Sequence, residues 1–306
     1  MYFQLLMDSA WRSEPANVSS FLESWGTRRC GRDSMKVRQA WRLLGETVYA
    51  ASAAQHYEHH MAYCSTGLLH GGTWDTMHGS EHPSWYNTSS LYTAWGLLIE
   101  AAKSECAAPL SKAFIFDLVD VGREYLSIAP CMTAYSALGE ANSTQSVAAA
   151  NSSMTTIMSD IDRLLGSSDG FLLGSWVSNA HEVAIAAGAP QDADFLEWNA
   201  RAQVTSWSPA DAQACNGQAT ALSALYDYGN KAWSGLVKGY YDRRYQIFAQ
   251  SKLCKLEPSA SGCDGFSYFG QLMKLACDFQ HSTAKMSAKA VGDAVAISEE
   301  LFAKYQ

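Results

Sequence analysis

The stretch that decides the fold reads LEWNARAQVTSW at residues 196–207 and LYDYGNKAWSGLVKGYYDRRYQIF at residues 225–248. In its second part, large hydrophobic side chains recur at the spacing of one broad helix face, namely Trp233, Leu236, Val237, Tyr240, Tyr241, Ile247 and Phe248. Asparagine, glutamine, arginine and tyrosine groups are interleaved with them. A buried polar group costs free energy unless it finds a partner. The stretch therefore predicts helices that either support a binding site or carry one.

Helical periodicity extends over most of the chain. Val18, Leu22 and Trp25 fall on one helix face, between a candidate N-cap at Asn17 and a candidate stop at Gly31. Further helices are predicted after Ser34, around residues 91–98, and over residues 111–129, 144–166, 171–187, 191–206, 229–252, 265–280 and 288–304. Ser168 or Asp169 is the candidate cap of the helix over 171–187. Alternating strand patterns are nearly absent, so the fold class predicted is all-α.

We expect a bundle of about ten helices, interrupted by long irregular loops at 51–89 and 208–224. With 306 residues, the chain is long enough for one large domain or two ordinary ones. Long loops without regular structure inside a compact domain are usually functional or are insertions. Both loops therefore remain of interest for function.

Charge and hydropathy argue against several classes of protein. The net charge is −8, and the longest cluster of basic residues is a pair such as Arg243–Arg244, so no nucleic-acid partner is predicted. No apolar run approaches the length of about 18 residues that a membrane span needs. The first fifteen residues lack a basic region and a continuous apolar block, so no signal peptide is predicted within this chain.

Marks of the secretory pathway nevertheless occur. Four Asn-x-Ser/Thr acceptors for glycosylation are present, at Asn17, Asn87, Asn142 and Asn151. Eight cysteines are an even number, but in a chain of this length they do not define a set of disulfides. The best local pair is Cys254 and Cys263, whose spacing is compatible with a disulfide or with two unpaired thiols. We expect a secretory, lysosomal or vacuolar, or extracellular location.

The histidines of the chain are the candidate metal ligands. Six of the eight histidines lie between His56 and His82, where His56 and His60 would share one helix face, as zinc ligands do. The metalloprotease pattern fails because Tyr57 follows the first histidine, so a solvated polar loop is favoured and neither a metal nor a cofactor is predicted. No phosphate loop, nucleophile elbow or C-x-x-C pair occurs.

Glycoside hydrolysis uses two carboxylates about 5–10 Å apart. Glu182, Glu197 and Asp227 are the carboxylates set among aromatic residues, and no obvious pair exists among them. For each we predict a surface role or a role in orienting a helix.

Seven blocks of the chain together resemble the C-terminal region of the lysosomal-type α-N-acetylglucosaminidases, a family of glycoside hydrolases. The most specific block is EWNARAQVTSW followed by LYDYGNKAWSGLVKGYYDRRY, at 197–207 and 225–245. The others occur in the family's order: AWRSEPANVSSFLESWGTRRCG, AWRLLGETVY, SWYNTSSLYTAWGLLIEA, FDLVDVGREYL and FLLGSWVSNA, with VGDAVAISEELFAKY at the end. The resemblance covers nearly the whole chain, so we expect residues 1–306 to form a single domain of this type.

What the resemblance implies for catalysis is largely negative. Members of the family have a small N-terminal domain, a central (β/α)-barrel and a helical C-terminal domain, and both catalytic glutamates of their retaining mechanism lie in the barrel. This chain matches only the helical part. It inherits no catalytic residue, and by itself it is expected to be inactive.

The helical domain in that family packs along the barrel and completes the sugar pocket. By motif position, Trp207 and Tyr228 correspond to residues that line the sugar site, with Leu225 beside them as an apolar wall. Indole and phenol faces suit the apolar side of an N-acetylglucosamine ring. Supporting roles behind the pocket fall to Asn199, Arg201, Gln203, Asp227 and Asn230.

The sequence departs from the family pattern at the pocket. The family has Trp-Gly-Pro and a short turn, whereas here Trp207-Ser208-Pro209 is followed by about a dozen extra residues, Ala210 to Ala224. Arg243 stands where the family commonly has proline. A longer loop costs little closure entropy, so the fold can survive the insertion.

The leading hypothesis is a helical domain that packs on a catalytic barrel and helps bind terminal α-linked N-acetylglucosamine, as in heparan-sulfate-type glycans. An alternative from another class is a stand-alone helical binding or scaffold module without catalysis. A third, an independent metalloenzyme, would use the histidines at 56–82.

Overall fold

The computed structural model describes residues 2–50, 86–207, 215–220, 226–227 and 229–306. Within these residues the chain is all-α, as predicted; a parallel bridge between Leu172 and Ser234 is isolated, and no strand forms. The described residues divide into two compact units: 2–50, 86–125 and 292–306 belong to the first, and the described residues between 126 and 291 belong to the second.

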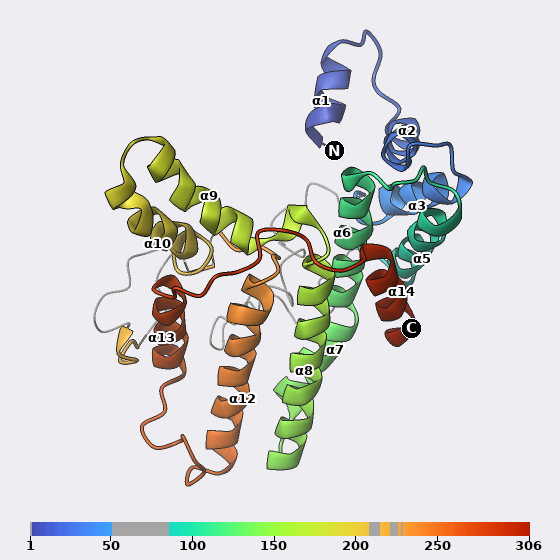
Figure 1. The fold of residues 1–306 in the computed structure, drawn as a ribbon. Coiled ribbons are helices and arrows are strands. Elements are labelled where there is room, and N and C mark those ends of the chain that lie inside the picture. The colour runs from blue at the N-terminus through green and yellow to red at the C-terminus, as the bar shows by residue number, and fades with distance from the viewer. Residues whose placement is uncertain (1, 51–85, 208–214, 221–225, 228) are drawn as a thin grey trace. The chain divides into compact units, whose positions relative to one another are not determined.

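The first unit is a group of helices around two tryptophans. Its helices are α1 (Tyr2–Ala10), α2 (Val18–Cys30), α3 (Met35–Glu46), α5 (Thr88–Ser104), most of α6 (Lys112–Ile128) and α14 (Ala294–Lys304). Helix α3 packs on both α2 and α5, and α14 packs on α5 (Figure 1). The rings of Trp41 and Trp95 are buried, and a disulfide joins Cys30 to Cys106.

The second unit carries the candidate site. It contains α7 (Pro130–Glu140), α8 (Thr144–Leu165), α9 (Leu173–Ala186), α10 (Ala193–Gln203), α12 (Asp242–Leu256) and α13 (Tyr268–Gln280), with 3-10 turns at Asp169–Phe171 and Pro190–Asp192 and a π-helical turn at Val237–Tyr241. Figure 1 shows α8, α12 and α13 side by side, and α12 packs on both of the others. Helix α10 packs on α9 and on α13, which fixes the segment that follows α10.

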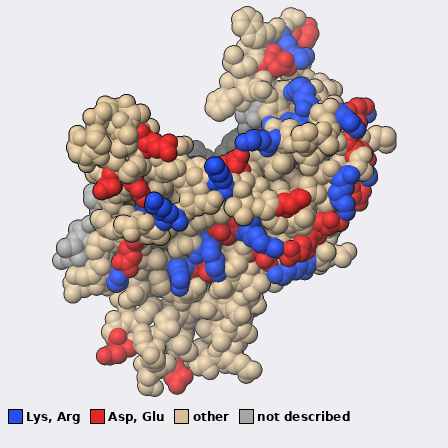
Figure 2. Space-filling model, viewed as in Figure 1, with Lys and Arg blue, Asp and Glu red and all other residues tan. Residues whose placement is uncertain are grey.

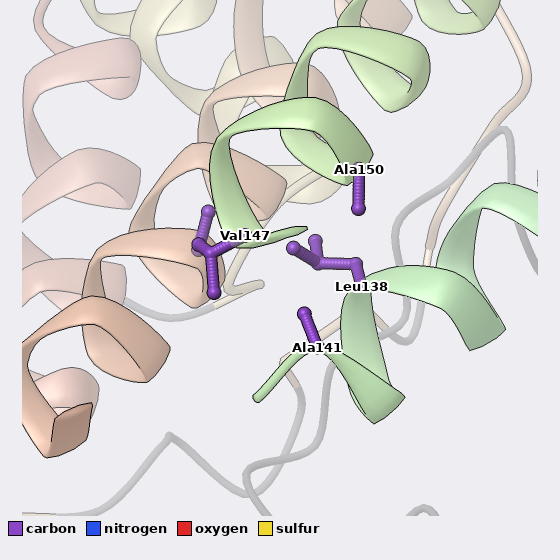
Figure 3. Close-up of a cluster of buried hydrophobic side chains, with 5 residues drawn as sticks. Leu138, Ala141, Val147 and Ala150 are labelled. Carbon is purple, nitrogen blue, oxygen red and sulfur yellow. The ribbon is translucent and has the colours of Figure 1, made fainter. Parts of the chain in front are cut away.

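A small hydrophobic cluster holds one end of this unit. It comprises Leu138, Ala141, Val147, Ala150 and Ala249. Figure 3 shows Leu138, on α7, lying between Val147 and Ala150 of α8. Because the small alanines let α7, α8 and α12 approach closely, the long helices are anchored against one another here.

Several predicted helix ends are present in the structure. The Asn17 side chain accepts a hydrogen bond from the Ser20 N–H at the start of α2, and that of Ser34 accepts from the Val37 N–H at the start of α3. Gly31 ends α2 in the left-handed conformation, with φ 74°. These features depend only on neighbouring residues, which is why the sequence could predict them.

The expected helix over 229–252 is wrong in its first turns. Helical structure begins only at Val237, with the π-helical turn, and α12 continues to Leu256. Gly235 has φ 88°, and Ser234 exchanges backbone hydrogen bonds with Phe171 and Leu173 instead of closing a helical turn. These contacts with residues distant in sequence override the helical period of 229–236.

The predicted cap of the helix over 171–187 is also wrong. Helix α9 starts at Leu173 without a side-chain cap, and neither Ser168 nor Asp169 caps it. The Asp169 carboxylate instead accepts from the Ala290 N–H at 3.0 Å, and the Leu173 N–H donates to the Ser234 carbonyl. The first amide of α9 therefore has a backbone partner elsewhere in the same unit.

Two helices, α1 and α7, were not predicted. Most of the expected loops at 51–89 and 208–224 lies outside the described residues; α5 begins at Thr88, inside the first of them. None of the helices in the described part of the chain is long and apolar enough to cross a membrane.

Candidate functional site

Trp207 lies just beyond the C-terminal end of α10 in a strained turn. Its φ is +50°, a left-handed conformation that is uncommon outside glycine, and its N–H donates to the Ala202 carbonyl at 2.8 Å. The side chain is 42% exposed, although the turn that carries it, from Val204 to Ser206, is buried. An exposed indole on a buried base can offer a fixed flat face to a ligand.

The segment 226–230 lies against this turn. The Asp227 N–H donates to the Thr205 carbonyl at 2.8 Å, and Asp227 itself has φ +64°. Gly229 lies against the Trp207 ring, since a Cβ there would be 2.6 Å from Trp207 Cζ3 and 2.3 Å from the Gln203 carbonyl oxygen. The structure thus brings together two segments that are separated by the insertion in sequence.

Trp207 and Asp227 are the only non-glycine residues with positive φ in the described part of the chain. Left-handed conformations of such residues cost of order 1–3 kcal/mol each and persist only where the surroundings impose them. They cluster at binding and catalytic sites. Trp207 and Asp227 are such residues, and the hydrogen bond from Asp227 to Thr205 brings them together, so we take this part of the structure as the candidate site.

Hydroxyl groups beneath the turn are held by one glutamine. The buried Gln280 amide, on α13, donates to Thr205 Oγ1 at 3.1 Å and to Ser206 Oγ at 2.6 Å. Thr205 Oγ1 donates in turn to the Arg201 carbonyl at 2.9 Å. This network ties the turn of Trp207 to both α10 and α13.

A buried arginine in an aromatic box holds the second segment. Arg244 Nη1 donates to Asp227 Oδ1 at 2.8 Å, and both side chains are buried. The guanidinium lies 5.0, 5.6 and 5.8 Å from the ring centroids of Tyr226, Tyr240 and Tyr241. The Tyr240 hydroxyl donates to that of Tyr226 at 2.7 Å.

The electrostatics of this box favour a charged arginine beside neutral phenols. Burial opposes the charged guanidinium, but Asp227 together with Tyr226 and Tyr240 outweighs this effect and raises the pKa of Arg244 well above its ordinary value. Burial raises the pKa of Tyr226 to about 12. Sequence reasoning missed Arg244; the pattern Tyr-Tyr-Asp-Arg-Arg-Tyr, with two arginines inside an aromatic face, was the available signal.

The residues predicted to support the pocket occupy different positions. Arg201 is buried, but its side chain donates to Glu197 Oε1 at 2.9 Å and to the Ala284 carbonyl at 3.0 Å, away from the Trp207 turn. The Asn230 amide donates to the Asp227 carbonyl at 2.7 Å. Asn199 and Gln203 are half-buried on α10.

The remaining members of the predicted pocket wall are Tyr228 and Leu225, which lie outside the described residues. The same holds for most of the insertion; of its residues, 215–220 are described, and Cys215 forms a disulfide with Cys277 of α13. A second disulfide of this unit joins Cys254 to Cys263. Trp207 is thus the one residue predicted to touch the sugar for which the structure supplies a position.

Two of the three carboxylates noted in the sequence are bound to arginine. Glu197 accepts from Arg201, and Asp227 accepts from Arg244. Glu182 and Glu197 also line a cavity of about 300 Å³ between α9, α10 and residues 284–286. His181 lines the same cavity, and its Nδ1 lies 3.6 Å from Glu197 Oε2.

No group of three or more histidine, cysteine, aspartate or glutamate residues in the described ranges is arranged to hold a metal. The histidines from His56 to His82 lie outside those ranges. On the face shown in Figure 2, basic and acidic side chains are interspersed.

Comparison with known proteins agrees with this architecture. The model of the α-N-acetylglucosaminidase (NAGLU) C-terminal domain family matches residues 21–304. Human α-N-acetylglucosaminidase is 27% identical over 310 residues, a match that covers 99% of this chain and 38% of the human protein.

Solved structures share the fold. A family 89 glycoside hydrolase from Clostridium perfringens in complex with 2-acetamido-1,2-dideoxynojirmycin matches with a TM-score of 0.75 and 20% identity, over 99% of this chain and 33% of that one. A family 89 glycoside hydrolase from the same organism in complex with PUGNAc matches with a TM-score of 0.76 and 19% identity, over 98% of this chain and 33% of that one. CpGH89 from the same organism, in complex with its substrate GlcNAc-α-1,4-galactose, matches with a TM-score of 0.74 and 20% identity, over 99% of this chain and 33% of that one.

These matches define the family and the extent of the likeness. The chain spans about a third of the length of the relatives that it matches. The family model matches nearly the whole chain, and the matched range of 21–304 includes Trp207 and Asp227. The chain therefore belongs to the α-N-acetylglucosaminidase C-terminal domain family of glycoside hydrolases.

Proposed function

We propose that this chain contributes one wall of a pocket for terminal α-linked N-acetylglucosamine, and that it does so by packing on a catalytic barrel of the same family. The observation that carries the proposal is Trp207, whose half-exposed indole stands on a buried, hydrogen-bonded turn. Aromatic faces of this kind bind the apolar side of sugar rings. Tyr228 and Leu225 are proposed as its neighbours in the wall.

Catalysis is assigned to the barrel. The arginine partners of Glu197 and Asp227 hold these carboxylates in structural roles, since each carboxylate already accepts a charge-assisted hydrogen bond. The domain would therefore bind and orient the sugar, while the two glutamates of the retaining mechanism come from the barrel. Heparan-sulfate-type glycans are the proposed substrate class.

The barrel is the proposed partner because helix α1 and the turn after it expose an unusual apolar surface. Phe3, Leu6, Met7 and Trp11 are all exposed there, within ten residues of one another. Contiguous apolar surface of this kind marks an interaction site. We propose that α1 packs against the barrel. Residues 1–306 together would form the single C-terminal domain that accompanies this barrel.

A secretory location, lysosomal or extracellular, is proposed on chemical grounds. Disulfides persist in oxidising compartments, and within the described residues they join Cys30 to Cys106, Cys215 to Cys277 and Cys254 to Cys263.

The test compares the chain alone with the chain joined to a catalytic barrel of the family. Hydrolysis of 4-nitrophenyl α-N-acetylglucosaminide is expected only for the joined protein. Turnover by the isolated chain that a point substitution within it abolishes would contradict the assignment. A joined protein that folds but is inactive, with a barrel known to be competent in its own enzyme, would favour the stand-alone binding module instead.

A further inference from the structure

Arg244 stands out among the charged residues of the second unit because it has no exposure and no place in the predicted site. Its side chain is 0% exposed, whereas the neighbouring Arg243 is exposed and donates to Gln246 Oε1 at 3.2 Å. Burying an arginine is costly unless the charge is paired. The Asp227 carboxylate supplies the pairing, and three tyrosine rings surround the guanidinium.

The pairing acts on the segment that faces Trp207. Asp227 is held at two points, by its carboxylate to Arg244 and by its N–H to the Thr205 carbonyl. Its own carbonyl accepts from the Asn230 N–H at 3.1 Å and from the Asn230 side chain at 2.7 Å. Asp227 and Asn230 are thereby held together, with Gly229 between them.

Gly229 is the point at which this fixed backbone contacts the Trp207 indole. It lies so close to the Trp207 ring and to the Gln203 carbonyl that any side chain there would overlap both. The indole is thus packed on one side by a backbone segment whose position depends on the pair of Asp227 and Arg244. Its other support is the Gln280 network beneath Thr205 and Ser206.

We propose that Arg244 is a positioning residue for Trp207: through Asp227 it fixes the 227–230 turn, and that turn sets the orientation of the exposed indole. The consequence for sugar binding rests on the function proposed above. The effect on the indole does not, because it follows from contacts within this unit.

The aromatic box explains why arginine rather than lysine occupies this position. A planar guanidinium can lie against ring faces while it donates to a carboxylate, whereas an ammonium group is a strongly hydrated point charge. Arg244→Lys therefore keeps the charge but loses the planar contact. We expect the turn to shift even in this conservative variant.

The experiment uses the full chain labelled with 5-fluorotryptophan and observed by fluorine NMR. The Trp207 resonance is assigned by its loss in Trp207→Phe. In Arg244→Lys we expect this resonance to shift or broaden, while that of the fully buried Trp95 in the other unit stays in place. Arg243→Lys is the matched control, because it makes the same chemical change one residue away, and it should leave Trp207 unchanged.

A double variant covers the case in which Arg244→Lys fails to fold. Asp227→Asn with Arg244→Met removes both charges together, so no unpaired buried charge remains, and asparagine tolerates the left-handed backbone at 227. The Trp207 resonance should move here as well. A resonance that stays at its wild-type position in a folded Arg244→Lys or double variant would overturn the proposal.

Titration with methyl α-N-acetylglucosaminide separates this proposal from the function it deepens. We expect the sugar to shift the Trp207 resonance in the wild type, and Arg244→Lys to weaken that affinity by roughly tenfold. If the Arg244 variant moves Trp207 but the sugar does not, the positioning role holds and the sugar wall fails. If the sugar binds both proteins with equal affinity and Arg244→Lys leaves the Trp207 resonance of the free protein in place, the wall holds and the positioning role is overturned.

Discussion

The N–H of Asp227 donates to the carbonyl oxygen of Thr205 at 2.8 Å, which joins two segments that are 22 residues apart. Both ends of the junction are strained, since Trp207 and Asp227 each have a positive φ. The partners that impose this strain are Gln280 beneath one segment and Arg244 beneath the other. The candidate site is therefore supported from α13 and α12 rather than by the local sequence alone.

Gly229→Ala should perturb this junction through sterics alone. The new methyl group would overlap the Trp207 ring and the Gln203 carbonyl, and overpacking of this kind costs typically about 1–3 kcal/mol. Gly139→Ala is the control, because a Cβ there meets nothing within 4 Å and lies in helix α7. That change should leave the stability unchanged or raise it by about 0.5–1 kcal/mol. Equal midpoints in urea unfolding for the two variants would contradict the packing of Gly229 on Trp207.

The sequence could predict what depends on neighbouring residues. Asn17 and Ser34 start their helices, and Gly31 ends one, because a cap needs only the amides or carbonyls of the adjacent turn. The helix predicted over 111–129 ends just before Pro130, as a proline stop suggests, but proline also suits the first position of a helix, and α7 begins with it. Local pattern alone does not separate these two uses.

Contacts between residues that are distant in sequence could not be predicted from local patterns. The period of 229–236 is helical, yet Ser234 pairs with Phe171 and Leu173, so the helix is delayed to Val237. Adjacent Arg243 and Arg244 differ completely in burial, and the partner of the buried one, Asp227, is 17 residues away in sequence. The motif that carries the family resemblance, by contrast, contains Asp227 and Asn230, and the structure places both next to the Trp207 turn; their role in sugar binding stays a prediction.

Stability should fall as the pH rises through the range in which Asp117 ionises. Burial raises the pKa of Asp117 to about 6, although Arg29 donates to both carboxylate oxygens and opposes the rise. In the unfolded chain this carboxyl has its ordinary pKa of 3.8, so the native state binds the proton more tightly. The contribution is fully present below about pH 4 and is lost by about pH 6, and it amounts to at most about 3 kcal/mol.

Urea unfolding of the wild type and of Asp117→Asn across this range measures the contribution. The difference in free energy of unfolding between the two proteins should vary with pH between about 4 and 6. Asp33→Asn, at an exposed carboxylate paired with Arg38, is the control and should show no such variation. A difference that is constant over the whole range would show that Asp117 has no raised pKa.

Two disulfides described in the second unit, Cys215–Cys277 and Cys254–Cys263, should differ in their contribution to stability. Cys215 and Cys277 are 62 residues apart, whereas Cys254 and Cys263 are 9 apart. The chain-entropy model gives about 4 kcal/mol for the long loop and about 3 kcal/mol for the short one. Thermal unfolding of the two double serine variants should therefore show the larger loss for the Cys215–Cys277 pair. The reverse order would mean that loop length does not control the effect here.

Glycosylation should be confined to a subset of the acceptor sites. Asn17, Asn87 and Asn142 are exposed at the starts of helices, where the side-chain amide nitrogen can carry a glycan. Asn151 lies within α8, half-buried, with its side-chain oxygen inaccessible to solvent. For the chain made in a secretory host, mass spectrometry should find glycans on exposed sites such as Asn142 and none on Asn151. An occupied Asn151 in folded protein would contradict the packing of α8.

The most direct test of the account is the role of Trp207 in hydrolysis by the joined enzyme. Trp176 provides a matched control, because its side chain is 41% exposed and that of Trp207 is 42% exposed. Trp207→Ala should lower kcat/KM for 4-nitrophenyl α-N-acetylglucosaminide by about tenfold or more, which corresponds to about 1.4 kcal/mol of lost stabilisation. Trp176→Phe should leave kcat/KM within about twofold of the wild type. An unchanged kcat/KM in a folded Trp207→Ala enzyme would contradict the claim that this chain forms a wall of the sugar pocket.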